Sequence, residues 1–281
     1  MKKFLIAISA LAVLGGVAAV PAQATPQEDL KQFRAYFFKK FPGVKLQDYG
    51  NGIYALDASR RFEWEEMEEF PPYEEGLEKG EKLFMKYGIA KCFPKGGVGI
   101  KQDYPYFDKK SGKVRTLEQD INACVVKNGH KKLKWKKGDL PAIGAYMAYT
   151  SRGKKQNVIV PNNKAALAAY EDGKTTFYAK RGQLNYACAD CHVYNSGMMA
   201  RGNLLSAGLG QTSHFPVWRR KWAGGQGGTK GFGTLQRRYG GCNKQVRAKA
   251  LKAQSEAYNN LEYFHTYMSN GIKLNGPAVR Q

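Results

Sequence analysis

The chain has 281 residues, of which 45 are Lys or Arg and 23 are Asp or Glu, so its formal net charge is +22. A basic field of this size favours anionic substrates or acidic partner surfaces. Nucleic acid is the usual alternative partner for a basic protein, but the first residues predict export and therefore argue against it.

Residues 1–24 predict a secretory signal peptide. Lys2 and Lys3 form a basic n-region, an apolar run follows, and Ala22-Gln23-Ala24 is a small-x-small cleavage site. The run is shorter than the ~20 residues that a membrane span needs, and no later stretch is apolar enough to cross a bilayer. We therefore expect a periplasmic mature chain without a membrane span. Its 257 residues (281 less 24) suffice for one large or two small domains.

Charge and glycine are unevenly distributed along the mature chain. Residues 63–81 hold nine glutamates, which we interpret as a solvated helical face, with a partner-docking patch as the alternative. Residues 126–140 form a basic connector with six lysines, which we interpret as a solvated loop, with docking of an anionic partner as the alternative. Residues 222–233 hold six glycines and predict a flexible loop.

The chain has five cysteines, and in an exported protein cysteines are expected to pair. Cys92 follows a helix predicted over 74–89. Cys124 lies in a helix predicted over 116–129, which begins with a capping box of Thr116 and Gln119. We expect Cys92 and Cys124 to form a disulfide, which would close a loop of about 33 residues and stabilise the fold by roughly 3–4 kcal/mol.

Residues 188–192 read "CADCH", the C-x-x-C-H pattern of covalent haem c attachment. On a helical turn these positions share one face, so Cys188 and Cys191 can form thioethers to the porphyrin while the His192 imidazole meets the iron. A thioredoxin-like redox pair or a disulfide is the alternative. A helix predicted over 162–183 leads into the motif, with Gly182 as its C-terminal stop.

One cysteine remains, Cys242 in "QRRYGGCNKQVRAKA", a stretch with no acidic residue. We predict a helix over 244–270, which places Cys242 at a helix start; the nearby cations and that position favour a thiolate. A buried, inert cysteine is the alternative. We expect residues from about 156 onward to form one helical haem domain. The cations near Cys242 are Arg237, Arg238, Lys244, Arg247 and Lys249.

The spacing leaves the second axial ligand of the haem open. Cys242, His214 and Met198 or Met199 all remain candidates, and the local positive charge favours Cys242. Three further residues of ligand type are expected to be structural: Met268 and His265 packed in the last helix, and His130 in a surface loop.

Several blocks in order resemble the SoxA family, the cytochrome c subunit of the SoxAX complex of bacterial thiosulfate oxidation. They are "CFPKGGVGIKQDYPYFDKKSGKVRTLEQDINAC", "YACADCH", "HFPVWR", "RRYGGCNKQVRA" and "LEYFHTYMSNG". The resemblance covers most of the mature chain. Because the sequence lacks a first C-x-x-C-H, it is similar to the single-haem form. The resemblance implies a mainly α fold with two cytochrome c-like domains in tandem, a haem-less one over 25–155 and a catalytic haem domain over 156–281.

The resemblance also implies residue roles. Cys242 matches a residue that is both an axial iron ligand and the catalytic cysteine, found as a persulfide. Arg238 matches a substrate-contacting arginine, and Arg247 matches a recurring basic position near the site. Cys188, Cys191 and His192 match the haem-binding residues.

The implied activity is that of an L-cysteine S-thiosulfotransferase. Thiosulfate is joined oxidatively to a cysteine of the sulfur carrier SoxYZ, and two electrons leave through one haem c, largely to the partner cytochrome SoxX. Two alternatives are a plain electron-transfer cytochrome, in which Cys242 is a ligand only, and a structural subunit that binds haem without turnover.

Overall fold

The computed structural model describes residues 24–224 and 228–280. The predicted signal peptide, apart from Ala24, lies outside the described residues, as does the middle of the glycine-rich segment 222–233. The described chain is mainly helical, as predicted. Its α-helices are α1 (Pro26–Lys40), α2 (Ala58–Glu69), α3 (Glu74–Lys86), α4 (Leu117–Lys127), α5 (Asp139–Tyr149), α6 (Lys164–Tyr178), α7 (Arg220–Ala223), α8 (Leu235–Gln245) and α9 (Glu256–Tyr267).

Short helical turns and short strands connect these helices. The 3-10 turns are η1 (Leu46–Ala55), η2 (Ile89–Cys92), η3 (Pro94–Gly97), η4 (Lys101–Asp103) and η6 (Gly228–Gly231), and η5 (Asp190–Tyr194) is a π-helical turn. Two antiparallel pairs are β1 (Tyr106–Asp108) with β2 (Lys113–Arg115) and β3 (Met199–Ala200) with β4 (Asn203–Leu204). A third sheet has the order β6 (Phe232–Gly233), β5 (Val217–Trp218), β7 (Ala278–Val279).

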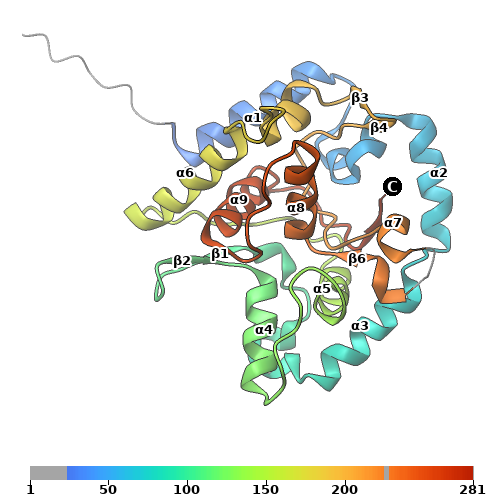
Figure 1. Cartoon of the computed structure of the whole chain (residues 1–281), viewed down its shortest axis with the longest axis vertical. Coiled ribbons are helices and arrows are strands. Elements are labelled where there is room, and N and C mark those ends of the chain that lie inside the picture. Colours follow the sequence, from blue (N-terminus) through green and yellow to red (C-terminus); the bar gives the residue numbers. More distant parts are fainter. Residues whose placement is uncertain (1–23, 225–227, 281) are drawn as a thin grey trace, which may run out of the picture.

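The helices surround two clusters of buried side chains. Figure 1 shows α3, α4 and α5 in the lower part of the molecule and α1, α6, α8 and α9 in the upper part. The first cluster lies among the lower helices, and it includes Leu83, Ile121, Val125, Leu140 and Ile143. The Cys92–Cys124 disulfide, present as predicted, ties η2 to α4 in this cluster.

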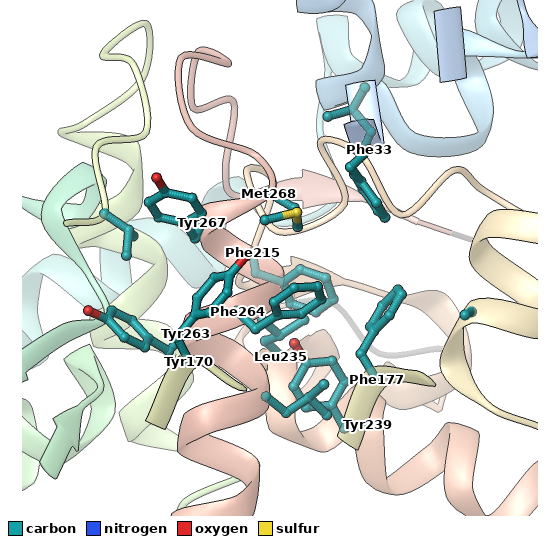
Figure 2. Packing of buried hydrophobic residues seen from close by; sticks show 14 of the residues in the cluster. Phe33, Tyr170, Phe177, Phe215, Leu235, Tyr239, Tyr263, Phe264, Tyr267 and Met268 are labelled. Atoms are coloured by element: carbon teal, nitrogen blue, oxygen red, sulfur yellow. The ribbon is translucent and has the colours of Figure 1, made fainter. Parts of the chain in front are cut away.

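The second cluster is largely aromatic and lies between α6, α9 and α1. Figure 2 shows Phe33, Tyr170, Phe177 and Phe264 packed together, with the rings of Tyr170 and Phe264 edge-to-face at 5.3 Å. Helices α6 and α9 can approach closely because Gly173 has no Cβ atom; a Cβ at this position would overlap the backbone of Asn260. This crossing forms one side of the site described below.

The two clusters do not divide the chain at a single point. Met147 belongs to the first and Val158 to the second, on either side of residue 155. However, Phe33 and Phe37 of α1 pack in the second cluster, whereas Phe232 and Val279 pack in the first. Both ends of the described chain therefore cross over to the other cluster.

Most of the predicted helices are present. The helix expected over 116–129 spans 117–127, and its capping box is confirmed by the Gln119 backbone N–H, which donates to Thr116 Oγ1 at 3.2 Å. Helices expected over 74–89 and 162–183 end earlier, at Lys86 and Tyr178. No helix among the described residues has both the length and the apolar composition of a membrane span.

The prediction of a single helix over 244–270 is wrong. Two helices occupy this region, α8 and α9, and residues 246–255 separate them. Helix α8 begins at Leu235 and is capped by Thr234, whose side chain accepts a hydrogen bond from the Arg237 N–H. The consecutive glycines 240 and 241, each disfavouring a helix by about 1 kcal/mol, concealed α8 in the sequence; its contacts with α9 stabilise it instead.

Candidate functional site

A cavity lies between α8, α9 and the segment that carries the C-x-x-C-H motif. The free cysteines of the described chain, Cys188, Cys191 and Cys242, all line it. Phe177, Phe215, Leu235 and Leu261 give it a largely apolar wall. Its lining is that of a site for a mostly apolar cofactor.

The C-x-x-C-H motif is held on a short helical segment that continues into η5. The Asp190 carboxylate accepts a hydrogen bond from the Ala187 N–H at 2.7 Å and so fixes the start of this segment. Burial raises the pKa of Cys188 to about 12 and also raises the pKa of Cys191. Catalytic redox pairs need a lowered thiol pKa, so these two thiols fit attachment of a cofactor better than disulfide exchange.

The His192 ring is oriented by groups behind it. Its Nδ1 atom lies 3.0 Å from the Ser206 carbonyl oxygen, to which an Nδ1–H donates. Gln211 Nε2 in turn donates to Ser206 Oγ at 2.9 Å. This tautomer leaves Nε2 of His192 to interact with the Cys242 sulfur or, in its place, with a metal, the arrangement in which metal-binding histidines usually occur.

Cys242 lies on α8, about fifty residues after the C-x-x-C-H motif in the sequence, and lines the same cavity. Burial by itself raises the pKa of the Cys242 thiol. The guanidinium of Arg238, one helical turn earlier, acts in the opposite sense, as do His192 and Arg219. Together these groups bring the Cys242 pKa down to about 7, so a large share of the sulfur is thiolate near neutral pH.

The origin of this activation differs from the one expected from the sequence. Cys242 lies in the last turn of α8 and not at a helix start, so the predicted contribution of a helix N-terminus is wrong. The activation comes from side-chain cations. Of the cations named from the sequence, only Arg238 lines the cavity among the described residues.

The other predicted cations point elsewhere. The Arg237 side chain donates to the Phe232 carbonyl at 2.9 Å and lies over the Trp222 ring at 4.1 Å. Arg247 is exposed, has a left-handed φ of 56°, and does not line the cavity. Lys244 and Lys249 are likewise exposed.

Arg219 is a residue near the site that sequence reasoning missed; it helps to lower the Cys242 pKa, although it does not line the cavity. It follows β5, and its backbone N–H donates to the Gly231 carbonyl at 3.0 Å. Its guanidinium lies over the Trp222 ring at 5.3 Å, and its buried Nε has no hydrogen-bond partner among the described residues. Burial and the neighbouring Arg238 lower the pKa of Arg219 to about 10, which still leaves it cationic at neutral pH.

Side-chain hydrogen bonds to α9 fix the position of α8. Asn243 Nδ2 donates to the Tyr258 hydroxyl at 2.7 Å, one residue beyond Cys242. The Tyr239 hydroxyl lies 3.0 Å from His265 Nδ1, and Gln236 Nε2 donates to the Glu262 carboxylate at 3.1 Å. The thiol is therefore held on a rigid support, which sites of covalent chemistry need.

The structure separates the candidates for the second axial ligand. Met198 and Met199 are 58% and 56% exposed and do not line the cavity. His214 is buried elsewhere, with Nδ1 3.0 Å from the Gly50 carbonyl. His265 does line the cavity, but its Nε2 donates to the Gly208 carbonyl at 3.1 Å and its Nδ1 accepts from Tyr239.

The remaining expectations for structural residues hold where the structure describes them. Met268 is buried in the second cluster and His130 is exposed. Because both ring nitrogens of His265 are already engaged, Cys242 is the cavity-lining donor that stays available with His192. Two attachment thiols, an oriented imidazole and an available sulfur in one apolar cavity fit a haem c group.

Comparisons with known proteins agree with this donor set. The family model "SoxA/TsdA, cytochrome c domain" matches residues 80–156. The chain is 49% identical, over 99% of its length and 96% of the relative's, to L-cysteine S-thiosulfotransferase subunit SoxA of Chlorobaculum thiosulfatiphilum. It is 47% identical, over 92% of its length and 91% of the relative's, to the SoxA of Allochromatium vinosum.

A solved structure is also similar. The crystal structure of SoxXA from P. pantotrophus matches with a TM-score of 0.64 and 28% identity, over 74% of this chain and 79% of that one. The resemblance to SoxA seen in the sequence blocks is thereby confirmed. With relatives near half identity over almost the entire length, the chain belongs to the SoxA family.

Proposed function

We propose that the chain is the catalytic subunit of an L-cysteine S-thiosulfotransferase, the activity named for its SoxA relatives. One observation carries the proposal. Cys242, with Arg238 and Arg219 beside it, lies in the same cavity as the C-x-x-C-H motif. A nucleophilic sulfur, cationic groups for an anionic substrate and a redox-cofactor site are thus brought together.

The residues of the cavity would hold one covalent haem c. Cys188 and Cys191 would form the thioethers, and His192 and Cys242 would bind its iron. When bound, the haem supplies an acceptor for electrons, which leave toward a partner cytochrome. The family's known SoxXA complex supports a SoxX-like subunit as that partner.

The reaction balances as an oxidative sulfur–sulfur coupling. The outer sulfur of thiosulfate bonds to the Cys242 sulfur, the thiol proton is lost, and two electrons are removed, which a bound haem would accept one at a time and pass on to the partner cytochrome. A thiolate of the carrier protein then attacks that outer sulfur, forms the cysteine S-thiosulfonate, and releases Cys242 as thiolate. If Cys242 carries a persulfide, the same two steps would take place at its terminal sulfur atom.

The two arginines would offset the negative charge of the reactants. Thiosulfate is a dianion and the carrier nucleophile is an anion, so their approach is opposed by repulsion. Arg238 can fork onto the sulfonate oxygens with parallel hydrogen bonds. Arg219 offers a second guanidinium, with an Nε that lacks a hydrogen-bond partner among the described residues.

The main alternative is a plain electron-transfer cytochrome, in which Cys242 is an iron ligand only. Such a carrier has no need of two arginines that lower the pKa of its ligand. The test uses Cys242→Ala and Arg238→Ala in the reconstituted complex. Each variant is expected to lose thiosulfate-dependent haem reduction while its covalent haem remains. Full turnover by Cys242→Ala would overturn the proposal.

The remaining expectations extend this proposal. We place the chain in the periplasm, with residues 1–24 as its signal peptide, and we assign a haem-less cytochrome c-like domain to 25–155 and the haem domain to 156–281. The family match over residues 80–156, which precede the C-x-x-C-H motif, supports a cytochrome c-like first domain. A SoxYZ-like carrier is the proposed sulfur acceptor.

A further inference from the structure

Two turns of the chain frame the mouth of the cavity. Most cavity-lining residues are buried or half-buried, but Tyr186 and Gln245 are exposed and mark where the cavity opens to solvent. Tyr186 belongs to a turn over residues 179–186, and Gln245 is the last residue of α8, directly before the turn at residues 246–247.

The two turns are built against each other. The Leu184 N–H donates to the Val246 carbonyl at 3.4 Å, and Arg181 and Tyr186 exchange backbone hydrogen bonds of 3.1 and 3.2 Å. Gly182, with φ of 70°, lies where a Cβ atom would overlap the Val246 carbonyl oxygen. The mouth therefore has a defined edge.

This edge is cationic. Lys180, Lys244, Arg247 and Lys249 are exposed on it, and the half-buried Arg181 lines the cavity. We call these five residues the cationic rim. Residues 179–187 and 237–255 contain no Asp or Glu. Among the residues that the structure describes, none of the rim cations forms an ion pair.

We propose that the cationic rim is the docking surface for an acidic protein that presents the acceptor cysteine to Cys242, an inference that rests on the proposed function. The acceptor thiol must enter through this mouth to reach Cys242, so the body of the protein that carries it must lie against the rim. Thiosulfate itself is small enough to be held inside by Arg238 and Arg219. Five outer cations exceed what that dianion needs, and they suit an acidic protein surface.

Apolar side chains complete the surface. Leu184 and Tyr186 are 39% and 46% exposed between the rim cations, and such groups give a protein partner contact area that a small anion could not use. The exposed position of Arg247 accordingly assigns it to docking, whereas the family resemblance had matched it only to a recurring basic position near the site.

The test compares two double charge reversals in the haem-loaded complex. Lys244→Glu with Lys249→Glu changes the rim. Lys109→Glu with Lys110→Glu makes the same change at the exposed turn between β1 and β2, away from α8 in Figure 1. The substrates are thiosulfate and a purified SoxYZ-type carrier. The measurement is the rate of carrier S-thiosulfonate formation against carrier concentration at several salt concentrations.

The rim variant is expected to raise the KM for the carrier about tenfold and to lose most of its salt dependence, with kcat at saturating carrier and haem content unchanged. The hairpin variant is expected to match wild type. Equal KM values for all three proteins, or an equal rise in both variants, would overturn the docking proposal while wild-type turnover still supports the proposed function. A wild-type complex that forms no S-thiosulfonate would instead overturn the proposed function.

Discussion

The side chains of Cys242 and His192 meet inside one cavity, where the imidazole contributes to the low pKa of the thiol. The two residues come from separate parts of the chain. His192 is held from behind by Ser206, and Cys242 is held by the bonds between α8 and α9. This pairing brings a sulfur and an imidazole together in the cavity, and we propose that both would bind the iron of a haem held there.

Arg219 is predicted to bind the anionic substrate. Arg219→Ala should lower kcat/KM for thiosulfate about 10- to 100-fold, because a charged hydrogen bond contributes roughly 1.5–3 kcal/mol. Steady-state kinetics at saturating carrier measure the effect. Arg220→Ala is the matched control, since Arg220 is adjacent and exposed. If the two variants are equally active, Arg219 has no role in substrate binding.

The Cys92–Cys124 disulfide is predicted to stabilise the first cluster. Replacing both cysteines with alanine should lower the free energy of unfolding by about 3–4 kcal/mol, because the bridge closes a loop across a sequence separation of 32 residues. Denaturant unfolding of the haem-loaded protein measures the loss. A reductant should destabilise the wild type and leave the double variant unchanged; an equal response of both proteins would contradict this account.

His214 is predicted to make stability depend on pH. Burial keeps the His214 pKa well below its usual value, so the folded state stays neutral while the unfolded state gains a proton as the pH falls below about 6.5. The unfolded state binds more protons, and His214 should reduce stability by about 1.4 kcal/mol for each pH unit below that point.

The control for this pH effect is His214→Asn. Its amide can still donate to the Gly50 carbonyl, but it does not titrate. The unfolding free energy of the variant should fall less steeply than that of wild type between pH 6 and pH 4.5, a range chosen to lie below the ordinary histidine pKa. Parallel pH profiles would show that His214 is not the group responsible.

Sequence patterns predicted the features that depend on local chemistry. The capping box at Thr116, the C-x-x-C-H motif and the Cys92–Cys124 bridge needed only residue types and short spacings. Helix α8 was missed because Gly240 and Gly241 disfavour a helix locally, whereas the tertiary bonds of Tyr239 and Asn243 stabilise one.

The rest of the site depends on contacts between distant segments. Arg219 lies near enough to Cys242 to lower its pKa because β5 pairs with β6, the strand that leads into α8, and no local motif marks it. The five cations near Cys242 are equivalent in the sequence. Arg238 lines the cavity because it lies on α8 one turn before Cys242, whereas Arg247 follows the end of the helix and does not line the cavity.

The most direct test of the central claim is electron paramagnetic resonance of the oxidised, haem-loaded protein. If the Cys242 sulfur and His192 serve the same iron, the wild type should show a low-spin ferric signal of the thiolate-ligated kind. Cys242→Ser should lose that signal while its covalent haem content stays the same. Identical spectra from the two proteins would contradict the claim.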